Sequence, residues 1–127
     1  MSSPKVASQM LQGFLDAFNA HDVDTVMSFF SEDCVFDMPR GPAPGGRRLV
    51  GKDEVREGIR SRFEGIPDVR YGDDRHWVCG DRGVSEWTFT GTRVDGTRVE
   101  VHGCDFYTFC AGEVIRKDSY WKLVETN

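Results

Sequence analysis

The chain has 127 residues, of which 39% are hydrophobic and 12% aromatic. This composition is typical of one globular domain with a hydrophobic core, and it excludes a disordered chain. The formal net charge is −5 and the two signs are interspersed, which excludes the clustered basic face of a nucleic-acid-binding protein.

Several signals are absent from the sequence. No apolar run has membrane-spanning length, and we do not expect the first residues, MSSPKVASQM, to form a signal peptide. The cysteines show no CxxC spacing and no grouping with histidine, so we expect reduced thiols, no zinc site and a cytoplasmic location. The Gly-rich loop over residues 41–46 lacks the lysine and the helix context of a phosphate loop. We expect no cofactor, no nucleic acid and no membrane partner.

Apolar residues recur at helical spacing in three places in the first half of the chain. The predicted elements are a helix that starts at Ser3-Pro4 and continues to residue 18, a helix that starts at Asp22, a strand over residues 34–38, and a helix over residues 52–63. Residues 40–48 are rich in glycine and proline and are predicted to form a loop.

The second half of the chain changes to the alternation that is typical of strands. The predicted strands cover residues 69–78, 84–93, 99–109 and 114–123, with hairpin signals at Gly80-Asp81, Asp95-Gly96 and Ala111-Gly112. Helices followed by an antiparallel meander indicate an α+β fold. No linker divides the chain, so residues 1–127 are expected to form a single domain.

Asp105 is an acid among apolar residues on one face of the predicted strand over residues 99–109. Successive side chains of a strand point to opposite faces, and the face of Asp105 is otherwise apolar. Burying a carboxylate costs several kcal/mol unless it is paired or protonated. Asp105 is therefore either a functional residue or an acid whose partners satisfy it within the core, and the two interpretations have equal weight at this point.

The hairpin turns decide which residue faces Asp105. Three-residue loops would place Asp105 opposite Lys117, whereas two-residue turns would place it opposite Asp118. We prefer the first register because it separates apolar from polar side chains more cleanly. Asp105 and Lys117 then form either a cross-strand ion pair near a sheet edge or a polar spot inside an apolar pocket.

Several segments together resemble a known superfamily. They are Asn19-Ala20-His21-Asp22, the stretch SEDCVFDMP over residues 31–39, Gly51-Lys52, and Asp105-Phe106-Tyr107-Thr108-Phe109. The chain resembles the nuclear-transport-factor-2-like superfamily, which includes ketosteroid isomerase and the SnoaL-like polyketide cyclases. The resemblance implies a cone-shaped barrel, in which a curved antiparallel sheet wraps around three N-terminal helices. It also implies a hydrophobic pocket and a homodimer formed through the sheet.

Of the three catalytic residues of ketosteroid isomerase, only one has a matching residue in this chain. The oxyanion-hole acid of the isomerase falls on Asp105, but its tyrosine falls on Phe14 and its general base falls on Met38. Asp37, one residue away, would replace that base only across a β-bulge. In the related epoxide hydrolases an arginine lies two residues before an aspartate, and here that position is Gly103. Both mechanisms are therefore disfavoured.

The SnoaL-like cyclases use an acid/base aspartate in an apolar pocket, and Asp105 is the candidate for that role. His76 and His102 are expected to face away from the pocket. Burial favours the protonated form of Asp105 and Lys117 favours the ionised form, so both states remain open. The catalytic candidates are Asp105, Lys117 and Asp37, and the expected pocket lining is Phe14, Met38, Trp87, Tyr107, Ser119 and Trp121.

Two functions follow from these expectations. The first is a SnoaL-like pocket protein that acts as a cofactor-free isomerase, cyclase or dehydratase, by proton transfer on a small hydrophobic or cyclic carbonyl compound. The alternative is a non-catalytic module of the same fold, which binds a hydrophobic ligand or serves in dimerisation.

Overall fold

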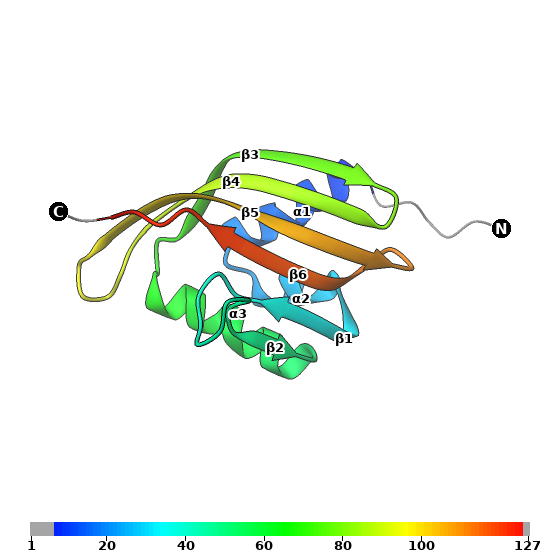
Figure 1. Ribbon diagram of the computed structural model, residues 1–127, viewed down its shortest axis with the longest axis horizontal. Helices are drawn as coiled ribbons and strands as arrows, with labels where there is room; N and C mark the ends of the chain where they lie inside the picture. Colours follow the sequence, from blue (N-terminus) through cyan, green and yellow to red (C-terminus); the bar gives the residue numbers. More distant parts are fainter. Residues whose placement is uncertain (1–6, 126–127) are drawn as a thin grey trace.

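The computed structural model describes residues 7–125, so the helix start expected at Ser3-Pro4 lies outside the described residues. Figure 1 shows the elements, which are α1 (Ser8–Asn19), α2 (Val23–Ser28), β1 (Phe30–Asp37), β2 (Arg48–Val50), α3 (Lys52–Gly65), β3 (Arg70–Cys79), β4 (Arg82–Thr92), β5 (Arg98–Cys110) and β6 (Glu113–Trp121). The expected α+β class is confirmed. The short strand β2 was not predicted, because three residues are too few for a pattern.

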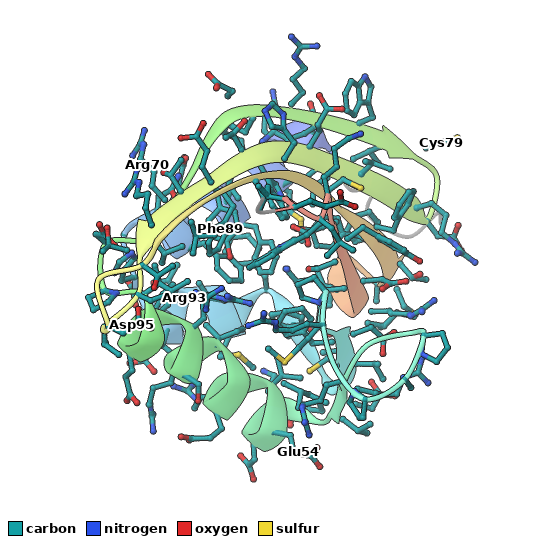
Figure 2. All side chains as sticks on the ribbon, turned by 60° about the vertical axis from the view of Figure 1, so that its left-hand side comes forward. Glu54, Arg70, Cys79, Phe89, Arg93 and Asp95 are labelled. Atoms are coloured by element: carbon teal, nitrogen blue, oxygen red, sulfur yellow. The ribbon has the colours of Figure 1, made fainter. Side chains whose placement is uncertain are left out.

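The six strands form one sheet in the order β2-β1-β6-β5-β4-β3. All neighbours are antiparallel except β1 and β6, which are parallel. The sheet is curved but open, because β2 and β3 do not pair. The long strands arch over the helices, and Phe89 points to the inner side of this arch (Figure 2). The inner face of the sheet is therefore the face that the helices cover.

The helices present apolar stripes to this inner face. Leu11, Phe14, Leu15 and Phe18 of α1 are buried, as their helical spacing predicts. Asp22 caps α2 as expected, since its side chain accepts a hydrogen bond from the Thr25 backbone nitrogen. Within the described residues, no helix is long and apolar enough to cross a membrane, and all four cysteines are free.

The register of the last hairpin differs from the predicted one. Asp105 pairs with Ser119, and Lys117 pairs with Tyr107. The turn is the two-residue one, Ala111-Gly112, but a bulge follows at once between Thr108 and Phe109. The bulge adds one residue after the two-residue turn. Asp105 and Lys117 therefore stay on the predicted face of the sheet, but each residue of β5 up to Thr108 pairs with a residue of β6 two positions beyond the predicted partner. The earlier hairpin has the predicted register, with Trp87 opposite Gly103.

Candidate functional site

An acid and a lysine are buried together on the inner face of the sheet. Asp105 is 1% exposed and Lys117 is 3% exposed. The Lys117 Nζ lies 2.9 Å from the Asp105 Oδ1 and 4.4 Å from the centre of the Phe36 ring. The two residues contact each other as predicted, although they are diagonal neighbours in the sheet and not a directly opposed pair.

Asp105 accepts hydrogen bonds from four side chains. Lys117 and Ser119 donate to its Oδ1. Trp87 Nε1 donates to its Oδ2 at 2.9 Å, and the Tyr107 hydroxyl donates to the same oxygen at 3.2 Å. A carboxylate has about four acceptor positions, and lysine and tryptophan nitrogens can only donate. The four donors therefore occupy both oxygens of the Asp105 carboxyl group.

Gly103 allows Trp87 to reach this carboxylate. The two residues are opposed across β4 and β5. A Cβ atom at position 103 would lie 2.6 Å from two atoms of the Trp87 ring, which is closer than van der Waals contact. The glycine therefore lets the indole lie across the strand with its nitrogen directed at Asp105.

A small cavity lies beside this cluster. Its volume is about 10 Å³, which is room for about one water molecule. Its walls are mostly apolar and aromatic, and the polar side chains that line it are Lys117, Ser119, Arg62 and Tyr71. Asp105 does not line the cavity; it lies behind Lys117 and Ser119 and contacts both.

The residues expected in the pocket fall into two groups. Met38, Trp87, Ser119 and Trp121 line the cavity. Phe14 and Tyr107 do not; they lie deeper in the core, where their rings meet edge to face with centroids 5.8 Å apart. Phe14 therefore packs against the ring of Tyr107, whose hydroxyl donates a hydrogen bond to Asp105.

Arg62 and Tyr71 were not identified from the sequence. The Arg62 guanidinium carbon lies 5.2 Å from the centre of the Phe89 ring and 5.0 Å from that of Trp121. Burial raises the pKa of Tyr71 well above its usual value. A signal was present for Arg62, because it follows Val55 and Ile59 at helical spacing and so belongs to the buried stripe of α3.

Asp37 lies on the other face of the sheet. Phe36 pairs with Lys117 and Asp37 pairs with Asp118, and no bulge separates the two pairs. The bulge that would have turned Asp37 towards the cavity is therefore absent from this part of β1. Asp37 instead accepts hydrogen bonds from Arg48 at 2.8 and 3.1 Å and from Arg116 at 2.9 Å. Burial raises the pKa of Asp37, but these two arginines outweigh it and hold the pKa below its usual 3.8.

A second group of polar side chains adjoins the hydrogen bonds of Asp105, and it includes His76. The expectation that His76 faces away from the pocket was wrong. A register shift between Gly72 and Arg75 turns His76 to the inner face. Its Nδ1 lies 2.8 Å from the Ser85 hydroxyl and its Nε2 lies 2.8 Å from the Asp74 carboxylate. Burial and the Asp105 charge raise the pKa of Tyr107, and a hydrogen bond from Ser85 acts in the opposite direction. Polar contacts thus extend from Asp105 across three strands.

Solved structures share this fold over nearly the whole chain. A candidate polyketide cyclase from Pseudomonas putida is 21% identical, with a TM-score of 0.83 and 94% of each chain covered. A nuclear-transport-factor-2-like protein of unknown function from Burkholderia pseudomallei is 24% identical, with a TM-score of 0.79, 90% of this chain and 88% of that chain covered. TerC, crystallised with polyporic acid, is 19% identical, with a TM-score of 0.76, 90% of this chain and 89% of that chain covered. The chain therefore shares its fold with these proteins.

A sequence model of one protein family identifies the family of this chain. The model of the SnoaL-like domain matches residues 11–117, so the chain belongs to the SnoaL-like family. A comparison with curated protein sequences finds no match.

Proposed function

We propose that the protein is a cofactor-free enzyme that moves a proton on a cyclic carbonyl compound, with Lys117 as the group that contacts the substrate. The observation that carries this proposal is the placement of a lysine, 3% exposed, on the wall of a cavity that is otherwise mostly apolar. Burial lowers the pKa of Lys117, although the Asp105 charge opposes this effect. Such a lysine is a better proton donor and acceptor near neutral pH than an exposed one.

Two donors face the place where a carbonyl oxygen would lie. Lys117 and the Tyr71 hydroxyl both line the cavity, and the described residues supply no hydrogen-bond partner for that hydroxyl. An enolate that forms when the α-carbon loses its proton would bind these donors more strongly than the neutral ketone does. Tyr71 would then have the role of the oxyanion-hole tyrosine of ketosteroid isomerase, which falls on Phe14 in the sequence comparison.

Asp105 would accept the proton indirectly, through Ser119. The α-proton passes to the Ser119 oxygen while the Ser119 proton passes to Asp105 Oδ1, with which it is already hydrogen-bonded. Return of the proton to a different carbon gives an isomer, and attack of the enolate carbon on a second carbonyl closes a ring. Asp37 has no part in these steps, because it lies on the opposite face of the sheet.

A non-catalytic ligand-binding module remains the second candidate. It is favoured by the saturation of Asp105, whose four acceptor positions are all filled by protein donors. In that case the acid holds Lys117 in place, and Lys117 merely binds a polar group of the ligand. The two candidates agree on the pocket and differ only in turnover.

We also propose a cytoplasmic homodimer. Trp77, Phe106 and Tyr120 are about half exposed, and all three lie on the outer face of the sheet, away from the helices. The same face contains both charge signs, for example Arg75 opposite Glu86, so a second copy related by a two-fold axis can match it. The four free thiols are consistent with a reducing compartment.

Exchange of α-protons tests the catalytic proposal without knowledge of the natural substrate. 1-Tetralone is incubated with the protein in D₂O, and loss of its α-proton signal is followed by proton NMR. We expect wild-type protein to accelerate exchange by about 10²–10⁴-fold over buffer. Lys117→Met and Ser119→Ala should each remove most of this acceleration. Lys122→Met is the matched control, because Lys122 is an exposed lysine just after β6.

The same samples separate the two candidates. A thermal shift with 1-tetralone, without exchange above the buffer rate, would favour the binding module over the enzyme. Exchange that survives in Lys117→Met would contradict the role of Lys117. Circular dichroism of each variant checks that the loss does not come from unfolding.

A further inference from the structure

Arg62 is a cation without an acid partner. Its guanidinium carbon lies 5.2 Å from the centre of the Phe89 ring and 5.0 Å from that of Trp121, and the two ring centres are 4.7 Å apart, so the guanidinium lies against both rings. No carboxylate forms an ion pair with it, and no hydrogen-bond acceptor contacts it, among residues 7–125. Arginine always has its charge in proteins and presents five donors. A half-buried arginine with free donors, on the wall of a cavity, is arranged to bind something that the chain itself does not supply.

Two further arginines lie near Arg62. Burial is the main cause that lowers the pKa of Arg62, and the charges of Arg40 and Arg93 lower it further, whereas Tyr71 acts in the raising direction. Asp105 is near enough to act in the opposite direction, but its charge is already matched by Lys117. An excess of positive charge at one place on a chain of net charge −5 indicates an anionic ligand.

A larger groove adjoins the small cavity. It has a volume of about 640 Å³ and lies between the loop after β1 and helix α3, with Arg40, Arg47 and one acid, Glu57, in its lining. Glu57 forms an ion pair with Arg60. Met38 and Gly58 line both the groove and the cavity. A volume of this size is within the usual range for small-molecule sites, about 300–1,000 Å³, whereas the cavity alone admits only water.

We propose that the pocket binds an anionic ring compound, such as an aromatic carboxylate or phenolate, and that Arg62 is the residue that selects the anion. The edge of the ring enters the aromatic cavity, which must widen to admit it, the rest of the ring lies in the groove, and the anionic group pairs with the Arg62 guanidinium. This inference rests on the proposed ligand pocket, but it does not require turnover.

Arg62 lines the cavity from α3, and it does not line the groove. Its side chain is held by two aromatic rings and by no hydrogen bond from the described part of the chain, so it can shift towards an anion without breaking a polar contact.

A pair of probes of equal shape tests the inference. 2-Naphthoate is an anion, and 2-naphthamide is its neutral isostere. Isothermal titration calorimetry is performed with wild-type protein and with Arg62→Met, which keeps the apolar part of the side chain. We expect wild type to bind naphthoate at least about tenfold more tightly than naphthamide, since hydrogen bonds between charged groups are the stronger ones. Arg62→Met should bind both probes with nearly the same affinity, and Arg62→Lys should keep part of the preference.

Arg60→Met is the matched control, because Arg60 lies on the same helix but is exposed and pairs with Glu57. It should keep the full preference for naphthoate.

Equal affinity of wild type for the two probes would overturn the anion inference and leave the proposed pocket intact. An unchanged preference in Arg62→Met would show that another cation selects the anion, and would overturn the role of Arg62. Failure of both probes to bind wild type would overturn the pocket itself, and with it the proposed function. Thermal unfolding of each variant distinguishes loss of binding from loss of fold.

Discussion

At the scale of single residues, the buried pair of Asp105 and Lys117 is an energetic problem as well as a site. Removing either charge from water costs several kcal/mol, and only mutual attraction and additional hydrogen bonds compensate for it. Asp105 has those bonds from Trp87, Tyr107 and Ser119, whereas Lys117 has one such bond, to Ser119, and contacts with the rings of Phe36 and Phe18. The acid is therefore better satisfied than the lysine, and the lysine is the member of the pair with freedom to act on a ligand.

We expect a double-mutant cycle to show strong coupling between these two residues. Asp105→Asn and Lys117→Met should each lower the free energy of unfolding by about 3–5 kcal/mol, because each leaves one charge buried without its partner. The double variant should lose less than the sum, by roughly 0.5–3 kcal/mol. Urea unfolding followed by tryptophan fluorescence measures all four proteins.

The exposed pair of Arg56 and Asp24, 2.6 Å apart at the surface, provides the control cycle. Exposed pairs contribute about 0.2–1 kcal/mol, so its coupling should be much smaller. Additive losses at Asp105 and Lys117 would mean that the two charges are solvated separately and do not form a buried pair.

The residues of the site differ in how far the sequence could predict them. Asp105 and Lys117 were identified because a strand alternates strictly, and one charged residue on an apolar face is then conspicuous. Arg62 was overlooked because an arginine at the end of a helix is usually exposed, and only its spacing from Ile59 marked it as inward-facing. His76 was placed on the wrong face because a bulge reverses alternation, and nothing in the local sequence marks that bulge clearly.

At the scale of elements, the last hairpin shows what decides register. Its turn has positive φ at both central residues, 52° at Ala111 and 77° at Gly112, as a type I′ turn requires. Glycine adopts this conformation without strain, whereas alanine adopts it only at an energetic cost, so the sequence signal at Ala111 was weak. The helices and the order of the long strands were predictable because apolar spacing extends over many residues, whereas turn length depends on one or two.

We expect Ala111→Asn to stabilise the protein. Asparagine adopts positive φ more readily than alanine and forms the preferred Asn-Gly pair of a type I′ turn. The gain in the free energy of unfolding should be about 0.5–1 kcal/mol, measured by urea unfolding. Ala43→Asn, in the exposed loop after β1, controls for a general effect of the substitution. A loss of stability in Ala111→Asn would indicate that the turn has a different conformation in solution.

At the scale of the whole molecule, the sheet separates two surfaces with different roles. Its inner face and the helices enclose the cavity. Its outer face has the exposed aromatic patch of Trp77, Phe106 and Tyr120, in which the rings of Phe106 and Tyr120 meet edge to face with centroids 5.4 Å apart. Because side chains alternate between the faces, a substitution in the patch should leave the pocket unchanged.

We therefore expect Phe106→Glu to abolish the proposed homodimer while it preserves ligand binding. A charge at the centre of an aromatic interface would have to be desolvated without a partner, so the dimer dissociation constant should rise by about 100-fold or more. Sedimentation velocity over a range of concentrations measures it. Val94→Glu is the control, because Val94 is 79% exposed but lies in the hairpin loop between β4 and β5, outside the patch. If wild type sediments as a monomer at all concentrations, the patch has another partner. If Phe106→Glu loses affinity for 2-naphthoate as well as the dimer, the two faces are coupled, and the pocket depends on the second copy.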